Sequence, residues 1–296
     1  MELEDLAIFR AVVQEGGILK AARKLHRVPS NVSTRIRQLE SSLGTELFHR
    51  DRQRLVVSQS GHRLLDYAEQ LLRLSGEAKA AVSGAAPGGV LRLGALESTT
   101  ASRLPAVLAA YHQRYPDVRV ELSTGTNDAL VAALAARRID AAFVAEAPHD
   151  AAVEAMPLFR ERLVLISPAG HAPIRRAQDV AGDSVIAFPN GCAYRRVLIR
   201  WLGDRRIAAM RVLDLSSYHA IVACVAAGAG IALMPEAVLA TLRSPPVERH
   251  PLPAVHAQIV TPLIWRAGEV HAALAALQAE LRRHARALRA TKLLLA

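Results

Sequence analysis

Polar side chains that can hydrogen-bond to DNA bases gather at the start of one predicted helix near the N-terminus. The helix is expected over residues 30–43, and its candidate base contacts are Ser30, Asn31, Thr34 and Arg35. An Asn side chain can pair with adenine through two hydrogen bonds, and an Arg side chain can pair with guanine in the same way. Ser33, together with the helix N-terminus, can bind a phosphate. A solvated helix face is the alternative explanation for each of these residues.

Three arginines follow in a segment whose alternating pattern predicts a small two-stranded wing. The segment covers residues 47–57, and its basic residues are Arg50, Arg52 and Arg54. Basic side chains at such a position suit contacts with the DNA backbone or the minor groove. Simple solvation of each arginine is the alternative.

Two short amphipathic helices across a tight turn are expected to position these side chains. Apolar residues recur at helical spacing before and after a break over residues 26–29, at Ile18, Ala21, Ala22 and Leu25, and then at Val32, Ile36, Leu39 and Leu43. This arrangement is a helix-turn-helix, whose second helix enters the DNA major groove. The sequence therefore predicts a winged helix-turn-helix domain over residues 1–58.

A long helix is expected over residues 59–83, with Ser58 as its N-cap. Its apolar seam consists of Leu64, Leu65, Ala68, Leu71, Leu72 and Ala78. An isolated helix cannot bury such a stripe, so a partner helix is required. We favour a helix from a second subunit over packing within the chain. A Gly- and Ala-rich hinge then follows over residues 84–89.

Beyond the hinge, strands and helices alternate, which predicts a mostly parallel sheet with helices on both faces. We expect one helix over residues 101–115, a strand over 163–167 and a last strand over 263–266. The predicted lobes are residues 90–167 plus 263–296 (lobe I) and residues 168–262 (lobe II). The expected fold class is thus multi-domain α/β: a winged helix-turn-helix, a linker helix and an α/β domain.

A ligand crevice in such a sheet lies outside the carboxyl ends of its strands. The candidate residues of lobe I that follow strands there are Glu97, Ser98, Thr99, Thr100, Thr126, Asn127 and Glu146. Those of lobe II are Phe188, Cys192 and Tyr218. Hydroxyls and backbone N–H groups at helix starts favour a carboxylate. Glu97 and Glu146 instead suit the two ammonium groups of a diamine, unless they pair with Arg103 or a neighbouring Arg.

Composition and motifs narrow the class of protein. The net charge of +10 and a pI near 10.4 are compatible with a polyanionic partner. Two cysteines, Cys192 and Cys224, make no disulfide framework and fit a reducing cytoplasm. No His-Glu-x-x-His, phosphate-binding loop or clustered metal spacing occurs, and no signal peptide opens the chain. We therefore expect no catalytic residue, no metal, no cofactor and no membrane contact. A redox sensor acting through Cys192, a solute-binding protein and a two-lobed enzyme are the alternatives.

The chain resembles the LysR-type transcriptional regulators over essentially its whole length. The N-terminal residues at that family's spacing are Phe9, Ala21, Ala22, Leu25, Ser33, Ile36, Leu39, Glu40, Leu43, Gly44, Leu47, Phe48, Arg50 and Gly61. Residues 94–105, 115–116, 139–140 and 225–232 look like its effector domain. The resemblance implies that this domain is a two-lobed α/β domain similar to type 2 periplasmic binding proteins. The resemblance implies effector contacts near Ser98, Thr99, Thr126 and Tyr218.

One departure from the family lies at the start of the recognition helix, where Pro29 and Ser30 replace the usual Gln-Pro. Residues 26–31 look like a subgroup that includes regulators of putrescine utilisation. The resemblance implies a cytoplasmic regulator that binds a double-stranded DNA operator as a homodimer or homotetramer. It also implies a small-molecule effector between the lobes, and contact with RNA polymerase if the protein activates transcription.

Overall fold

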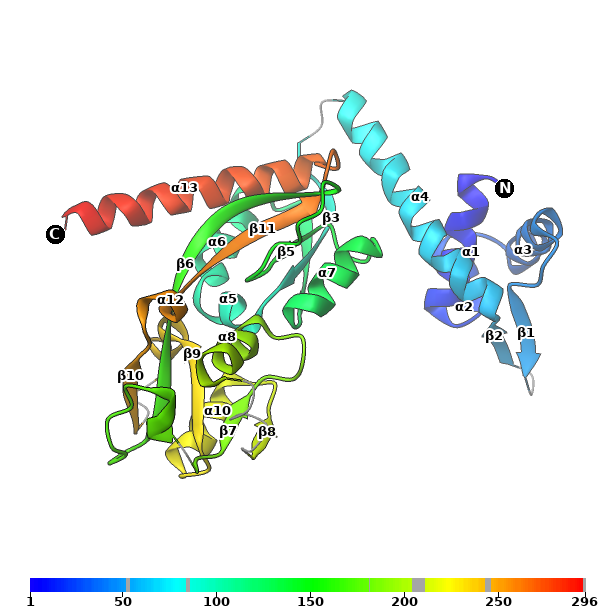
Figure 1. Cartoon of the computed structure of the whole chain (residues 1–296). Helices are drawn as coiled ribbons and strands as arrows, with labels where there is room; N and C mark the ends of the chain where they lie inside the picture. Colours follow the sequence, from blue (N-terminus) through cyan, green and yellow to red (C-terminus); the bar gives the residue numbers. More distant parts are fainter. Residues whose placement is uncertain (52–53, 84–85, 181, 204–210, 243–245, 295–296) are drawn as a thin grey trace. The chain divides into compact units, whose positions relative to one another are not determined.

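The computed structural model describes residues 1–296 except 52–53, 84–85, 181, 204–210, 243–245 and 295–296 (Figure 1). The chain divides into two compact units, Met1–Ala85 and Ala86–Ala296. The division falls within the hinge that the Gly- and Ala-rich sequence predicts. None of the helices in the described part of the chain is long and apolar enough to cross a membrane.

The first unit begins with three helices, α1 (Leu3–Glu15), α2 (Ile18–Lys24) and α3 (Pro29–Leu43). Gly16 and Gly44 end α1 and α3 in the left-handed conformation that glycine adopts most readily. Helix α3 starts one residue earlier than predicted, because Pro29 occupies its first turn, where a missing N–H costs no hydrogen bond. Phe9, Val32 and Leu39 are fully buried between the three helices.

The predicted wing is present as β1 (Phe48–Asp51) paired antiparallel with β2 (Arg54–Val57). The Glu40 carboxylate on α3 accepts hydrogen bonds from the backbone N–H groups of Leu47 (2.8 Å) and Phe48 (3.3 Å). It thereby ties the recognition helix to the start of the wing. Glu40 therefore has a structural partner within the fold.

Helix α4 (Gln59–Ser83) begins where the sequence predicts. The Ser58 hydroxyl accepts the N–H of Gly61 at 3.0 Å, which confirms its capping role. Ala68 is buried against the first unit's core, and Leu64, Leu65 and Leu72 pack partly against it. The first half of the seam thus packs within the chain, on α1. Tyr67, Leu71 and Leu74 remain exposed.

The second unit contains a sheet in the order β4-β3-β5-β11-β6-β9-β7-β8, with β10 paired to β6. Lobe I contains β3 (Gly89–Ala95), β4 (Val118–Thr124) and β5 (Ala141–Phe143), which run parallel. Lobe II contains the parallel strands β7 (Val185–Ala187), β8 (Val212–Asp214) and β9 (Ile231–Pro235). It also contains β10 (Val247–Pro251), which pairs with β6.

The expectation of a mostly parallel sheet was wrong, because two long strands run antiparallel to their neighbours. They are β6 (Val153–Pro168) and β11 (Gln258–Arg266), which pair with each other and connect the lobes (Figure 1). Both extend beyond the short segments predicted at 163–167 and 263–266. Strand β6 already pairs with β9 at Leu163, five residues before the predicted start of lobe II at residue 168.

Helices cover the sheet in both lobes. Those of lobe I are α5 (Glu97–Ser102), α6 (Leu104–Arg114), α7 (Asn127–Ala135) and α13 (Ala272–Leu294). Those of lobe II include η1 (Ala177–Val180), α8 (Ala193–Leu202), α10 (Tyr218–Ala226), α11 (Glu236–Leu239) and α12 (Ala254–Ala257). The single helix predicted over 101–115 is instead two helices that meet at Arg103. Pro105 lacks the N–H needed to continue the preceding turn.

Candidate functional site

The recognition helix α3 presents most of its predicted base-reading side chains to solvent. Ser30, Asn31 and Thr34 are exposed, while Ser33 and Arg35 are half-buried. Val32, Ile36 and Leu39 occupy the opposite, buried face. Helical periodicity therefore separates the core residues from the candidate readers, as the sequence predicts.

Arg35 is engaged in ion pairs with the first helix. Its Nε lies 2.8 Å from Asp5 Oδ1, and one Nη lies 3.1 Å from Glu4 Oε2. Arg27, in the turn, also pairs with Glu4 and donates a hydrogen bond to Asn31 Oδ1 at 3.2 Å. Contact between Arg35 and a base therefore requires exchange of a protein carboxylate for DNA. The sequence prediction missed Glu4, Asp5 and Arg27 as parts of this face.

The three wing arginines are only partly within the described structure. Arg50 lies on β1 and Arg54 on β2, where their backbones pair with Leu55 and Asp51. Arg52 lies outside the described residues. Their predicted DNA contacts stay predictions.

A pocket opens between the two lobes of the second unit. Its walls are Leu96, Glu97, Gly125 and Thr126 from lobe I, and Phe188, Cys192, Ala193, Tyr194 and Tyr218 from lobe II. It contains about 280 Å³ of empty space, part of it open to solvent. Five of the ten predicted effector residues line it.

Glu97 is the one acidic side chain in the pocket wall. One carboxylate oxygen accepts the backbone N–H of Tyr218 at 3.3 Å, across the lobes. The other, Oε2, is buried without a hydrogen-bond partner among the described residues. Burial raises the pKa of the Glu97 carboxyl, although the Tyr218 hydrogen bond and the nearby charge of His219 partly offset this effect.

Aromatic rings form much of the wall facing Glu97. Phe188 and Tyr218 lie with their ring centroids 4.7 Å apart. The Tyr194 hydroxyl lies 3.2 Å from Ser98 Oγ, also across the lobes. Burial raises the pKa of both tyrosines, so that each remains a neutral hydroxyl. Leu96, Gly125, Ala193 and Tyr194 also line the pocket but are not among the predicted effector residues, and their only signal in the sequence is proximity to those residues.

Of the predicted serine and threonine residues, Thr126 lines the pocket, whereas Ser98, Thr99 and Thr100 do not. Ser98 and Thr99 are buried on α5, and Thr99 Oγ1 has no hydrogen-bond partner in the described structure. The Thr100 hydroxyl donates to the carbonyl of Leu96 at 3.2 Å. Thr126 both lines the pocket and caps α7 by accepting the N–H of Ala129 at 3.4 Å. Capping and pocket contact therefore coexist at Thr126.

Asn127 has a structural role. Its Oδ1 accepts the N–H groups of Ala145 and Glu146, both at 3.0 Å, and its Nδ2 donates to the Glu146 carbonyl at 3.2 Å. The side chain is buried and joins the start of α7 to the segment after β5. With these bonds in place, its amide has little capacity left for an effector.

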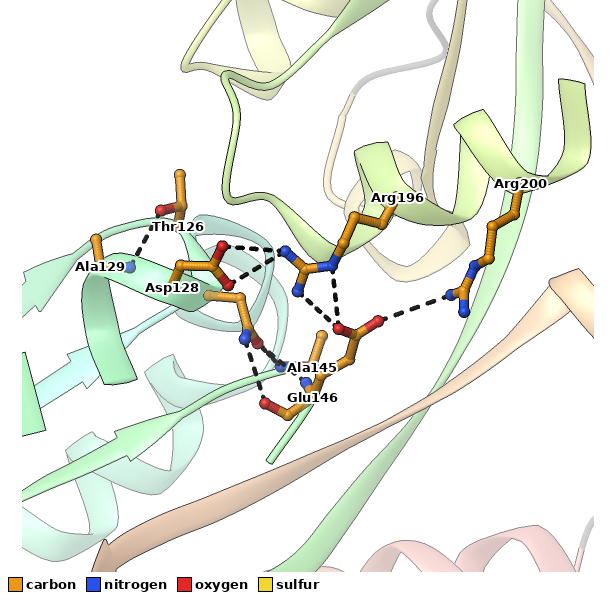
Figure 2. Close-up of polar contacts among 8 residues, drawn as sticks. Thr126, Asp128, Ala129, Ala145, Glu146, Arg196 and Arg200 are labelled. Atoms are coloured by element: carbon orange, nitrogen blue, oxygen red, sulfur yellow. Dashed lines mark hydrogen bonds and ion pairs between the residues drawn. The ribbon is translucent and has the colours of Figure 1, made fainter. Parts of the chain in front are cut away.

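Glu146 pairs with arginines of lobe II. Figure 2 shows the Arg196 side chain between Asp128 and Glu146, with Arg200 on the far side of Glu146. The shortest Arg196–Glu146 contact is 2.6 Å, and Arg200 lies 3.7 Å from the same carboxylate. Glu146 therefore pairs with arginines, which was the predicted alternative to its binding a diamine. Arg103, the other candidate partner, pairs with Glu161 at 2.8 Å.

Cys192 is buried in the pocket wall, and Cys224 is partly buried against the lobe II core. Burial raises the pKa of the Cys192 thiol, which disfavours the reactive thiolate at neutral pH. Within the described residues, no group of three or more His, Cys, Asp and Glu side chains is placed to bind a metal ion.

Comparison with known proteins gives matches over both units. Residues 3–62 match the bacterial regulatory helix-turn-helix protein, lysR family, and residues 84–286 match the LysR substrate binding domain. The HTH-type transcriptional regulator YusT of Bacillus subtilis (strain 168) is 35% identical over 268 residues, which is 90% of each chain. GltR of the same organism is 34% identical over 81% of this chain and 82% of its own.

Solved structures share the fold over nearly the whole chain. Full-length CbnR in complex with its target DNA has a TM-score of 0.68 at 24% identity, covering 96% of this chain and 99% of its own. A full-length OxyR variant from Pseudomonas aeruginosa has a TM-score of 0.72 at 19% identity, covering 95% of each chain. These likenesses agree with the fold described above, and the families and curated relatives are transcriptional regulators, not enzymes.

Proposed function

We propose that this chain, which belongs to the LysR family of bacterial transcriptional regulators, is controlled by an effector that bears an ammonium group. The protein is a DNA-binding regulator with an effector-binding domain. Our proposal concerns the chemistry of the effector and the residues that read DNA. It rests mainly on the unpartnered Glu97 oxygen in the pocket between the lobes.

An ammonium group suits the pocket because a buried carboxylate oxygen there lacks a partner among the described residues. A charged group held away from water is costly unless it is paired and hydrogen-bonded. An ammonium ion would supply the missing hydrogen bond to Glu97 Oε2, and the nearby Phe188 and Tyr218 rings would add cation–π attraction. The apolar surfaces of Leu96 and Ala193 would pack against a short hydrocarbon body.

The sequence also allowed a carboxylate effector. The residues that line the pocket disfavour it. Among the described residues that line the pocket there is no Lys or Arg. The N–H of Tyr218 is already donated to Glu97, and Thr126 already caps α7. An anion would therefore lie beside Glu97 without a compensating Lys or Arg among the described residues that line the pocket. The putrescine resemblance of the recognition helix also favours an amine.

We propose that the effector acts by changing the relative orientation of the two lobes. Glu97 belongs to lobe I, whereas Phe188, Tyr194 and Tyr218 belong to lobe II, so a ligand that contacts all four favours one lobe arrangement. In a homodimer or homotetramer this change would alter the spacing of the DNA-binding helices. Ser30, Asn31, Thr34 and Arg35 of α3 would read the operator. The protein would act in the cytoplasm, and an activator would also contact RNA polymerase.

The proposal is tested by thermal unfolding with n-butylamine, 1,4-diaminobutane, butyrate and succinate. At 100 times its Kd a ligand stabilises the fold by about 2.7 kcal/mol, which corresponds to roughly 5–10 °C for a domain of this size. We expect such a shift with an amine and its loss in Glu97→Gln. Glu121→Gln is the matched control, because Glu121 lies on β4 and pairs with Arg92 on the sheet surface.

The amine effect should also depend on pH. The pKa of Glu97 is raised above its ordinary 4.5, so binding is full above that raised pKa and is lost as the pH falls through it. The loss should occur at a higher pH than for an exposed carboxyl and should be absent in Glu97→Gln. Stabilisation by butyrate or succinate, without any amine effect, would refute the proposal.

A further inference from the structure

One guanidinium group forms hydrogen bonds with two carboxylates at the edge of the pocket. Arg196 Nη1 lies 3.1 and 3.2 Å from the two oxygens of Asp128, and Nε and Nη2 lie 3.1 and 2.6 Å from Glu146 Oε2 (Figure 2). Asp128 and Glu146 belong to lobe I, and Arg196 belongs to α8 of lobe II. Such forked contacts are the stronger form of charge-assisted hydrogen bond.

This cluster adjoins the effector pocket on both lobes. Asp128 follows the pocket residue Thr126 by two positions, and the N–H of Arg196 donates to the carbonyl of the pocket residue Cys192 at 3.2 Å. The lobes are also close here, since the Asp128 N–H donates to the Gly191 carbonyl at 3.4 Å. The charges of the cluster therefore act on whatever occupies the pocket.

The formal charge of the cluster is zero, because Asp128 and Glu146 are balanced by Arg196 and Arg200. Arg200 is the weaker partner, since its single contact with Glu146 is 3.7 Å long and its side chain is 63% exposed. Without Arg196, two carboxylates would share Arg200 and leave one negative charge beside the pocket. Glu97, the acidic side chain among the described residues that line the pocket, has no Lys or Arg partner there, and His219 is the nearby group whose positive charge acts on it.

We infer that Arg196 determines specificity, because it occupies the carboxylates that would otherwise bind the second ammonium group of a diamine. The effector of the native protein therefore carries one positive charge in the pocket, bound at Glu97. This inference rests on the proposed ammonium effector and goes further, by distinguishing monoamines from diamines. A diamine placed in the native pocket would bring its second ammonium group to a neutral wall, at a desolvation cost.

The test compares n-butylamine with 1,4-diaminobutane, which share the same carbon chain. Their Kd values would be measured by calorimetry on the full chain for the wild type, R196M, R196K and R119M. We expect the wild type to prefer n-butylamine. In R196M the Kd of 1,4-diaminobutane relative to that of n-butylamine should fall by about tenfold. The expected change is modest because the cluster is partly exposed and screened by solvent.

Two of the variants are controls. R196K keeps a positive charge between the carboxylates and should retain most of the wild-type ratio. R119M removes the same net charge from the opposite end of β4, where Arg119 is 78% exposed, and should leave the ratio unchanged. Retained binding of n-butylamine by R196M would show that its pocket is intact.

Several outcomes would overturn the inference. A diamine preference in the wild type, or an unchanged ratio in an R196M protein that still binds n-butylamine, would refute it while leaving the ammonium proposal in place. Loss of both ligands in R196M with normal binding in R196K would assign Arg196 a purely structural role. If neither amine binds the wild type and Glu97→Gln behaves identically, the proposed ammonium effector itself fails.

Discussion

At the scale of single residues, the face of α3 that we propose reads DNA has acidic side chains beside its arginines. Glu4 pairs with both Arg27 and Arg35, and Asp5 pairs with Arg35. Glu4 is 53% exposed, whereas Asp5 is 10% exposed and also accepts the N–H of Glu2 at 3.1 Å. Glu4 is therefore the carboxylate that can be removed with least damage to the fold. We infer that its pairing with Arg27 and Arg35 competes with contacts of these arginines to DNA phosphates.

Replacing Glu4 by Gln should raise the affinity for DNA of random sequence several-fold and steepen its salt dependence by about one released counterion for each phosphate that a freed arginine binds. Operator binding should rise less, which lowers the discrimination between the two. Fluorescence anisotropy with operator and random duplexes at several salt concentrations measures both effects. Glu15→Gln is the control, since Glu15 pairs with Lys24 near the end of the same helix. Weaker binding to both duplexes would instead show that Glu4 only orients the arginines.

At the scale of elements, the backbone of the linker helix α4 approaches the backbone of the wing closely at Gly61. A Cβ atom at Gly61 would lie 2.3 Å from the carbonyl oxygen of Leu47 and 2.7 Å from a Val57 methyl group. Both neighbours belong to the wing region that Glu40 ties to α3. Only glycine allows α4 to pack this closely.

Gly61→Ala should therefore lower the free energy of unfolding of the first unit by about 1–3 kcal/mol, as overpacking does. Gly76 lies in the same helix, and a Cβ atom added there would have no atom within 4 Å. Gly76→Ala should therefore stabilise the helix by about 0.5–1 kcal/mol. Thermal unfolding of the two variants measures the difference, and the fold of each would be checked by circular dichroism. Equal stability of the two variants would contradict the close approach at Gly61.

At the scale of the whole molecule, the linker helix exposes apolar side chains that its own unit does not cover. Tyr67 and Leu74 are 65% and 62% exposed, and Leu71 lies on the same helix at 38%. Because isolated apolar stripes require a partner, we attribute this surface to a second subunit. Dimerisation would also place two recognition helices on one DNA duplex.

A Leu71→Glu/Leu74→Glu double variant should shift the protein from oligomer toward monomer in sedimentation velocity. Its operator affinity should fall by at least an order of magnitude, because two linked half-sites bind more tightly than one. Leu19→Glu, an equally exposed leucine on α2, should leave the oligomer intact. An unchanged sedimentation coefficient in the double variant would exclude this surface as the subunit interface.

Local patterns in the sequence were sufficient for the elements and for part of each candidate site. Apolar spacing and the Ser58 cap predict α3 and α4 to within one residue, because these signals act within one helical turn. The positions of Glu97, Thr126, Phe188, Cys192 and Tyr218 follow from their places at strand ends and helix starts. The matched family spacing and this placement together indicated a two-lobed domain with a pocket.

The pairing of side chains far apart in sequence was decided only by the tertiary structure. Arg35 meets Glu4 and Asp5, Glu146 meets Arg196, and Asn127 hydrogen-bonds the backbone after β5. The antiparallel course of β6 and β11 likewise depends on strand pairing across about a hundred residues. Periodicity identifies the buried face of an element but carries no information about which charge lies opposite another. Hence Glu97, whose Oε2 has no hydrogen-bond partner among the described residues, and Glu146, which pairs with Arg196, look alike in sequence and differ only in the fold.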